Sequence, residues 1–313
     1  MTPTSEEISW FGEGFEAIVG NIERVVRGKR RVIRLVTGAM ISGGHALIED
    51  VPGVGKTLLA KSLARSVDCP FQRIQFTPDL LPSDVTGVSI WDRDRNDFVF
   101  KQGPVFASVV LGDEINRASP KTQAALLEAM EEGQVTIDGI TRRIDEPFMV
   151  IATQNPIEHE GTYPLPESQL DRFMFRVTVG YPDPADELDM LNTHGVVSAF
   201  DDLEPVVHGA DVVRLIGIAA RIHVSSAVQQ YVIDIVTATR NHPSVVLGAS
   251  PRAALFLQRA ARTFAAAAGR DYASPDDVKA LLDPVLGHRL ILSADARTSG
   301  GSVSYTHLRA HET

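Results

Sequence analysis

Cysteine is almost absent from this chain of 313 residues, in which Cys69 is the single one. One cysteine cannot form an intrachain disulfide, which excludes a disulfide-stapled scaffold and favours a reducing, cytoplasmic compartment. Long hydrophobic runs are absent too: the sequence contains no stretch of about 18 apolar residues, the length that is needed to cross a bilayer. The first residues lack the basic and then apolar pattern of a signal peptide. We therefore expect a cytoplasmic protein without membrane insertion.

Basic residues are in deficit as well. Lys and Arg total 30 against 40 Asp and Glu, and the formal net charge is -10 at pH 7. Nonspecific nucleic-acid binding requires a basic surface that neutralises phosphates, so nucleic acid is not expected as a partner. The remaining composition, 44% hydrophobic and 22% charged, is that of a globular protein.

Strand-like and helical patterns alternate up to about residue 180. Apolar runs begin at Ala46, Ser108 and Phe148, and each ends at turn or polar residues. Such alternation predicts an α/β fold in which a mainly parallel sheet is flanked by helices. We expect this domain to span residues 1–180.

Helical periodicity characterises the segment that follows. Asp183-Pro184, Ser250-Pro251 and Ser274-Pro275 each place an oxygen acceptor at an N-cap and a proline in the first turn of a helix. These signals predict a small all-α domain over residues 181–298. Residues 299–313 have no hydrophobic periodicity, and we interpret them as a non-native tail.

Two β-hairpins are expected to decorate the sheet. Residues 87–100 have the pattern of two short strands joined by a charged turn. Residues 134–143 alternate around Asp138-Gly139, which is a strong signal for a hairpin turn. Between the hairpins, a helix is predicted over residues 121–132, with Gly133 as its left-handed stop.

The strongest chemical signal is Asp50-Val-Pro-Gly-Val-Gly-Lys-Thr, which lies between a strand-like and a helix-like segment. This is the context of a phosphate-binding loop, in which glycines let backbone N–H groups approach the phosphates of ATP. Lys56 would reach the terminal phosphates, and the Thr57 hydroxyl would ligate Mg²⁺. The strict pattern has glycine at the position that Asp50 occupies here. We expect the loop to work with Asp in that place, because Asp tolerates the left-handed conformation. The predicted nucleotide-binding residues are Asp50, Pro52, Gly53, Val54, Gly55, Lys56, Thr57 and Leu58.

Further polar groups end two other strand-like segments. Asp113 and Glu114 follow residues 108–112. At the carboxyl edge of a parallel sheet, Asp113 would hold Mg²⁺ and Glu114 would polarise the attacking water. Asn155 follows residues 149–154 and can orient that water or contact the γ-phosphate without adding charge. The alternatives are a solvated acidic turn and an ordinary Asn-Pro turn.

Two arginines stand in unusual places. Arg172 follows a helix-like stretch and could simply pair with Asp171. Arg252 falls in the first turn of the helix that Ser250-Pro251 opens, where the helix dipole disfavours a cation and an anion such as phosphate would relieve it. For both arginines, a surface ion pair is the alternative to a role with nucleotide.

Together these residues form an ordered set of motifs that resembles the MoxR family of AAA+ ATPases, over about residues 5–298. The set comprises the phosphate loop and the segments LGDEINRA (111–118), KTQAALLEAMEE (121–132), ATQNP (152–156), LDRF (170–173) and ASPRA (249–253). The resemblance implies Walker A residues at Lys56 and Thr57, a Walker B pair at Asp113 and Glu114, sensor 1 at Asn155, an arginine finger at Arg172 and sensor 2 at Arg252. It also implies that residues 87–100 are the helix 2 insert.

The resemblance implies a chaperone-like ATPase that hydrolyses ATP with Mg²⁺ as cofactor. Family members form hexamers with ATP between subunits, and they activate partners that often carry von Willebrand factor A domains. If Arg172 lies on the opposite side of the domain from Lys56, a neighbour's finger must complete each site in a head-to-tail ring. The expected catalytic residues are Glu114, Asn155, Arg172 and Arg252, and the expected metal ligands are Thr57 and Asp113.

Other functions share some of these motifs. The ATPase subunit of a metal-chelatase-type complex has the same inserts and also meets a von Willebrand partner, so the sequence separates it poorly from a chaperone. A nucleotide-switched scaffold would need neither the base Glu114 nor the finger Arg172. A DNA-remodelling motor is disfavoured by the acidic charge, and a small-molecule kinase would not need Arg252 on a helical lid.

Overall fold

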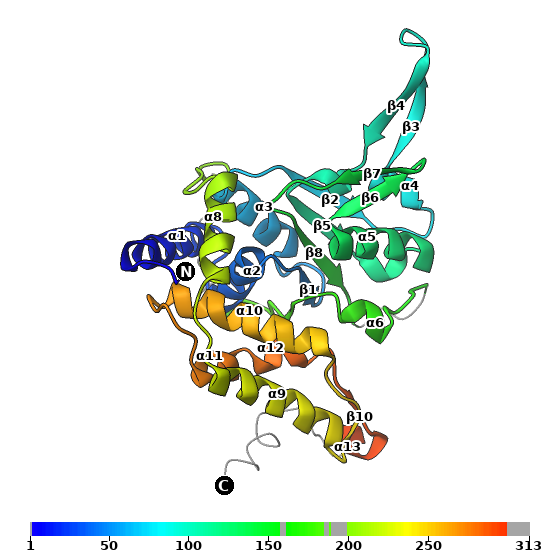
Figure 1. Ribbon diagram of the computed structural model, residues 1–313. Helices are drawn as coiled ribbons and strands as arrows, with labels where there is room; N and C mark the ends of the chain where they lie inside the picture. The colour runs from blue at the N-terminus through cyan, green and yellow to red at the C-terminus, as the bar shows by residue number, and fades with distance from the viewer. Residues whose placement is uncertain (1, 157–160, 185–187, 189–198, 299–313) are drawn as a thin grey trace.

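Five parallel strands form the central sheet, in the order β2-β5-β8-β1-β9 (Figure 1). The computed structural model describes residues 2–156, 161–184, 188 and 199–298. The predicted α/β fold is confirmed, and all three predicted strand segments are present. The strands span Ala46–Glu49 (β1), Phe71–Gln75 (β2), Val109–Asp113 (β5), Met149–Gln154 (β8) and Phe175–Val177 (β9).

Helices cover both faces of the sheet because its central strands are apolar on both sides. Ile48 and Ile151 belong to one buried cluster with side chains of α1, α2 and α3, whereas Leu47 and Val150 belong to a second cluster with side chains of α5. Neighbouring residues of a strand point to opposite faces, so β1 and β8 contribute to both clusters. The helices here are α1 (Ser5–Glu23), α2 (Arg30–Ile41), α3 (Lys56–Ser66), α4 (Pro82–Thr86), α5 (Pro120–Glu132) and α6 (Glu167–Leu170), with 3-10 turns at Pro104–Phe106 and Ile115–Arg117.

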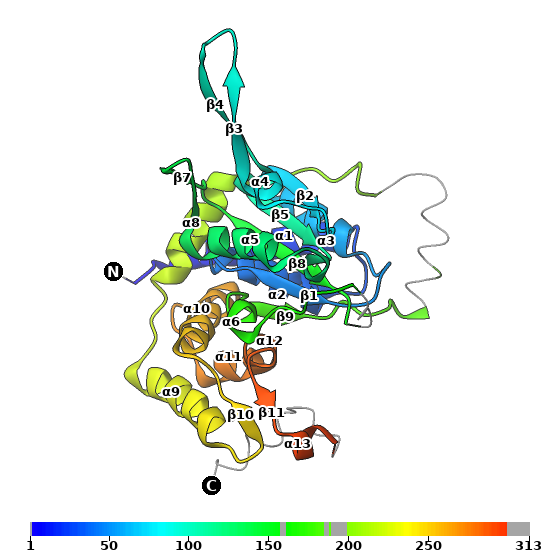
Figure 2. The same cartoon turned by 90° about the vertical axis from the view of Figure 1, so that its right-hand side faces the viewer.

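Both predicted hairpins are present, and the first stands out from the body of the protein (Figure 2). At the tip of the second, Asp138 and Gly139 have positive φ angles of 53° and 74°, as a two-residue hairpin turn requires. The helix predicted between the hairpins is α5. The hairpin strands are β3 (Gly87–Asp92) with β4 (Asp97–Gln102), and β6 (Gln134–Ile137) with β7 (Ile140–Arg143).

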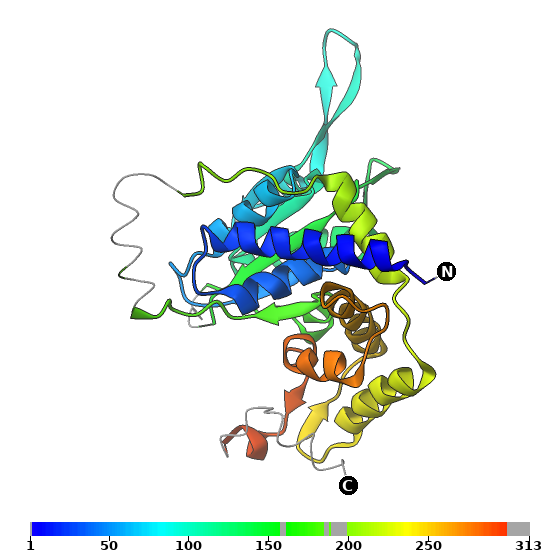
Figure 3. The same cartoon turned by 90° about the vertical axis from the view of Figure 1, so that its left-hand side faces the viewer.

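The second part of the chain is mainly helical and packs against the first. α10 contacts α1 and α2, and α8 contacts the same two helices (Figure 3). Ser250 and Ser274 accept hydrogen bonds from the backbone N–H groups of Ala253 and Asp277, so they cap α10 and α11 as predicted. The elements are α8 (Gly209–Ala220), α9 (Ser226–Asn241), α10 (Pro251–Ala267), α11 (Pro275–Ala280), α12 (Leu282–Leu286) and α13 (Ala294–Thr298).

One feature of this part differs from the prediction, and two predicted segments lie outside the described residues. A small antiparallel ribbon joins β10 (Val245–Leu247) to β11 (Ile291–Leu292), where the sequence pattern predicts no strands. The helix predicted from Asp183-Pro184 runs into residues outside the described ones, and the tail 299–313 lies outside them entirely.

Candidate functional site

The phosphate loop, the two acids and the sensor-like Asn155 meet at one edge of the sheet, whereas the two predicted arginines do not join them. Because all five strands are parallel, their carboxyl ends lie together, and this edge is where ligands bind in open α/β sheets. The phosphate loop follows β1, the Asp113–Glu114 pair ends β5, and Asn155 follows β8. Since β8 lies between β5 and β1, the buried Asn155 stands between the acids and the loop.

The loop after β1 has room for phosphate oxygens. Gly53 and Gly55 have φ angles of 86° and 89°, and a Cβ built on either would meet no atom within 4 Å. Gly55 caps α3, so the N-terminal N–H groups of that helix face the loop. Lys56 Nζ donates to the carbonyl oxygen of Asp50 at 2.8 Å and thus reaches across the loop. This arrangement fits a bound triphosphate.

Asp50 replaces glycine for a different reason from the one predicted. The described non-glycine residues with positive φ are Asp68, Asn96, Glu114 and Asp138, so Asp50 does not adopt the left-handed conformation. Its buried carboxylate instead accepts hydrogen bonds from the N–H groups of Val51, at 2.9 Å, and Gly180, at 2.6 Å. The side chain therefore ties the start of the loop to the segment after β9.

Two side chains fix the carboxylate of Asp113, the predicted Mg²⁺ ligand. Its Oδ1 accepts a hydrogen bond from Thr153 Oγ1 at 2.6 Å, and its Oδ2 pairs with Arg73 Nη2 at 2.5 Å. Carboxylate and hydroxyl oxygens are the ligands that Mg²⁺ prefers, so Asp113 with Thr57 of α3 is a donor set of the right chemistry. Neighbours that orient a metal ligand in this way tune its affinity.

Glu114 has a strained backbone and two side-chain partners. Its φ of 56° is left-handed, which costs a residue with a Cβ about 1–2 kcal/mol. Its N–H donates to Thr153 Oγ1 at 2.9 Å, and its Oε2 accepts from Gln75 at 2.9 Å and from Arg117 at 3.0 Å. Strain of this kind persists where surrounding contacts hold it, and it is common at functional sites.

Sequence reasoning missed Arg73, Gln75 and Thr153. The first two lie on β2, whose pattern Phe-Gln-Arg-Ile-Gln contains no apolar run, and only Ile74 of this strand is buried. Their importance follows from the register, in which Gln75 lies opposite Asp113. Thr153 is fully buried on β8, where its hydroxyl contacts the carboxylate of Asp113 and the backbone N–H of Glu114. A hydroxyl inside an otherwise apolar strand was the one available signal.

Arg172 lies at the opposite edge of the sheet. It precedes β9, and two residues later Met174 N donates to the carbonyl of His45, just before β1 begins. A strand of four residues spans about 13 Å, and this length separates the start of β1 from the phosphate loop at its end. Arg172 is therefore remote from Lys56 of the same chain.

Arg172 and Arg252 contact the same carboxylate. Arg172 Nη2 lies 2.8 Å from Glu131 Oε2, and Arg252 Nη2 pairs with Glu131 Oε1. The ion-pair alternative thus holds for both arginines, but with Glu131 of α5 as their partner. The interpretation of Arg172 as a partner of Asp171 is wrong, because Asp171 is bound elsewhere. Glu131 also supplies the anion expected beside Arg252 at the start of α10.

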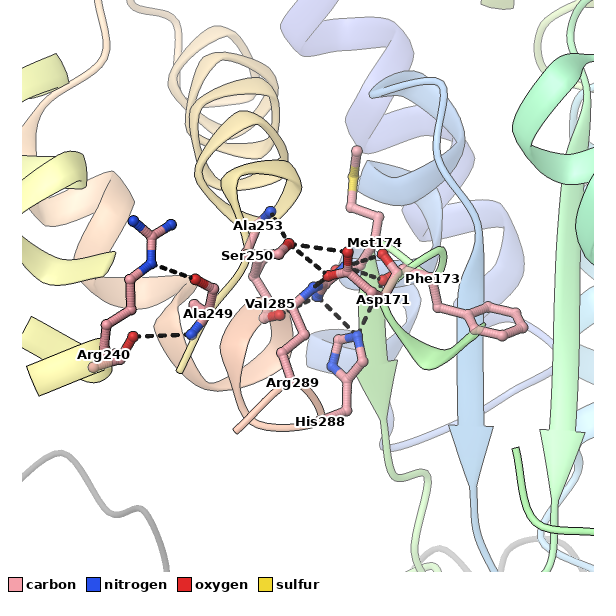
Figure 4. A network of polar contacts seen from close by, with 11 residues as sticks. Asp171, Phe173, Met174, Arg240, Ala249, Ser250, Ala253, Val285, His288 and Arg289 are labelled. Atoms are coloured by element: carbon pink, nitrogen blue, oxygen red, sulfur yellow. Dashed lines mark hydrogen bonds and ion pairs between the residues drawn. The ribbon is translucent and has the colours of Figure 1, made fainter. Parts of the chain in front are cut away.

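Asp171 joins the two parts of the chain (Figure 4). Its carboxylate accepts from Ser250 Oγ at 2.9 Å and from Arg289 Nε at 2.8 Å. Arg289 also donates to the carbonyl of Asp171 at 3.0 Å and is 5% exposed. Burial lowers the pKa of Arg289 to about 10, so the guanidinium stays charged near neutral pH and satisfies Asp171.

Comparisons with known proteins agree with this geometry. Residues 45–175 match the model of the ATPase family associated with various cellular activities (AAA), and residues 237–304 match an AAA lid domain. The chain is 44% identical to Chaperone MoxR1 of Mycobacterium tuberculosis over 94% of this chain and 82% of that protein. The chain belongs to the MoxR family of AAA+ ATPases. The predicted resemblance is confirmed.

A further relative and a solved structure extend the match. The uncharacterised Bacillus subtilis protein YeaC is 49% identical over 90% of this chain and 88% of its own length. A crystal structure of a candidate ATPase from Cytophaga hutchinsonii superimposes with a TM-score of 0.88 at 38% identity, over 97% of this chain and 94% of that one. Within the described residues, no helix is both long and apolar enough to cross a membrane.

Proposed function

We propose that this MoxR-family protein hydrolyses ATP with Mg²⁺ inside a ring of identical subunits, expected to be a hexamer, and uses turnover to remodel partner proteins. The name of the M. tuberculosis relative, a chaperone, supports the remodelling role. The proposal includes a cytoplasmic location and a partner with a von Willebrand factor A domain. We assign residues 1–180 to nucleotide binding and 181–298 to the lid.

Within each site, the phosphate loop residues 50–58 would bind the triphosphate, with Thr57 and Asp113 as ligands to Mg²⁺. A bound Mg²⁺ supplies charge neutralisation at the phosphates. Glu114 acts as general base on the attacking water, and the hydrogen bonds from Gln75 and Arg117 orient its carboxylate. Asn155 positions the same water.

The observation that carries the proposal is the separation between the two edges of the sheet. The phosphate loop and the acids follow the carboxyl ends of the strands, whereas Arg172 precedes β9 at their amino ends. Arg172 cannot serve the nucleotide of its own chain across this distance. In a head-to-tail ring, the sheet edge that carries Arg172 in one subunit faces the edge that carries the phosphate loop, the phosphate edge, of the next subunit.

Steady-state hydrolysis by four variants of the full chain tests the proposal. Arg172→Ala should keep nucleotide binding and lose about 10³- to 10⁵-fold in turnover, the usual contribution of an arginine finger. Glu114→Gln should bind ATP and retain it unhydrolysed, and Lys56→Ala should bind poorly. Arg31→Ala, at an exposed arginine of α2, is the matched control. Wild-type turnover by Arg172→Ala or by Glu114→Gln would overturn the assigned roles.

A further inference from the structure

We propose that Glu131 is a positioning residue that joins Arg172 and Arg252 into one unit, which acts on the nucleotide of the neighbouring subunit. This inference rests on the proposed function, because it assumes a site completed between subunits. It adds that Arg252 of the lid and Arg172 of the sheet domain act together on the neighbour's nucleotide. The carboxylate of Glu131, from their own subunit, holds both arginines in place.

The first support is that Glu131 is itself firmly placed. It is the penultimate residue of α5, and the preceding Met130 bonds through its carbonyl oxygen to His45 Nε2 at 3.0 Å. His45 is buried and precedes β1, so this bond fixes the end of α5 at the amino edge of the sheet. The Glu131 carboxylate therefore lies at the edge that carries Arg172.

The second support is electrostatic. Two guanidinium groups repel each other when close, and the Glu131 carboxylate offers one oxygen to each, so it offsets that repulsion. The closest contact of each arginine to Glu131 is made by Nη2. A guanidinium has five N–H donors in a planar fork, so such a contact is compatible with a phosphate on its other side.

The third support is the contact between Asp171 and Ser250, which are close neighbours of the two arginines in sequence. Asp171 precedes Arg172, and Ser250 lies two residues before Arg252. Ser250 Oγ donates to both carboxylate oxygens of Asp171 at 2.9 Å, and the buried Arg289 clamps Asp171 from the lid side. The backbones that bear Arg172 and Arg252 are thus fixed to one another. Arg252 of the lid is therefore held at a set place relative to Arg172 of the sheet domain.

The unit is also reachable from outside the subunit. The side chains of Arg172, Arg252 and Glu131 are 28%, 35% and 31% exposed, respectively. Arg172 borders an open cavity of about 470 Å³ between α5 and β6. Because the phosphate loop of the same chain lies at the other edge of the sheet, the nucleotide that the unit can reach is that of a neighbour.

Glu131→Gln tests the positioning role in the full chain. We expect turnover to fall about 10²-fold, the typical cost of a catalytic group displaced by about 1 Å, while the KM for ATP changes little. Glu131→Asp keeps the charge and should recover part of the rate. Glu13→Gln, the same change at an exposed residue of α1, should leave turnover unaltered. Equal turnover by Glu131→Gln and wild type would overturn the inference.

Mixed rings test the action between subunits. Two differently tagged chains are co-expressed, and rings that carry both tags are purified. A ring of Glu131→Gln with Lys56→Ala subunits should regain activity, because about a quarter of its random head-to-tail interfaces join an intact phosphate loop to an intact Glu131. The matched control pairs Glu131→Gln with the double variant Lys56→Ala/Glu131→Gln, and should regain none.

The same experiment separates this inference from the proposed function. Rings of Arg172→Ala with Lys56→Ala should recover activity if a finger acts between subunits, and rings of Arg252→Ala with Lys56→Ala should recover if the lid arginine acts there too. Recovery with Arg172→Ala but not with Glu131→Gln or Arg252→Ala would refute the unit and keep the finger. No recovery with Arg172→Ala would refute the finger itself, and the inference with it.

Discussion

The hydroxyl of Thr153 offers a sharp test of how the two acids are held. It donates to Asp113 Oδ1 at 2.6 Å and accepts from the Glu114 N–H at 2.9 Å, and the residue is fully buried. Thr153→Val removes the hydroxyl with little change of shape. The substitution leaves a carboxylate without a charge-assisted hydrogen bond and a backbone N–H without an acceptor.

The expected magnitude follows from those two bonds. A lost hydrogen bond to a charged group and an unpaired, partly buried N–H each cost about 1–3 kcal/mol, so we expect Thr153→Val to lower the free energy of unfolding by about 2–6 kcal/mol. Because Thr153 also orients the predicted Mg²⁺ ligand, we expect a loss of about 10- to 100-fold in turnover or in Mg²⁺ affinity.

Urea unfolding and a Mg²⁺ titration of ATPase activity measure the two effects. Thr37→Val is the matched control, since Thr37 on α2 is 1% exposed and its hydroxyl has no hydrogen-bond partner among the described residues. That change should be neutral or stabilising, because it removes a buried polar group that is not satisfied. Equal losses of stability in the two variants, with an unaltered Mg²⁺ titration, would show that the Thr153 hydroxyl does not hold the two acids in place.

Three further predictions concern the fold. Burial lowers the pKa of His45 from 6.5 to about 4, so the unfolded chain takes up the proton first and about 3 kcal/mol of stability is lost as pH falls from 6.5 to 4. Unfolding at a series of pH values should show this slope in wild type and a shallower one in His45→Gln, and parallel curves would count against it. Arg289→Met leaves Asp171 without its buried cation and should cost about 3–5 kcal/mol in a urea titration, whereas an unchanged midpoint would contradict this. Gly38→Ala places a Cβ 2.6 Å from the Phe264 ring and should destabilise by about 1–3 kcal/mol, whereas Gly20→Ala meets nothing within 4 Å and should stabilise by about 0.5–1 kcal/mol. Thermal unfolding of both variants measures these effects, and melting temperatures that shift in the same direction would contradict the prediction.

Local signals in the sequence were sufficient to predict the phosphate loop and several other elements. Glycines in the loop, a proline after each serine cap and an Asp-Gly turn each have one favoured backbone geometry, so the loop after β1, helices α10 and α11 and the second hairpin could be predicted. The roles of the phosphate-edge residues in hydrolysis remain predictions.

Contacts between distant segments could not be predicted in this way. β2 is polar, so nothing local indicated that Arg73 and Gln75 lie against the acids of β5. Asp50 was expected to replace glycine by adopting the left-handed backbone conformation. Its carboxylate instead accepts a hydrogen bond from the N–H of Gly180, which is 130 residues away. The shared contact of Arg172 and Arg252 with Glu131 likewise joins segments that only the folded chain brings together.

A site completed between subunits is tested most directly by the Mg-ATPase rate per subunit, measured on the full chain over a wide range of protein concentration, with Arg172→Ala alongside. If each site is completed between subunits, the rate per subunit rises with concentration, in step with the appearance of a ring by mass measurement, and Arg172→Ala has a low rate at every concentration. A wild-type rate that stays constant while the protein is monomeric would contradict a site completed between subunits.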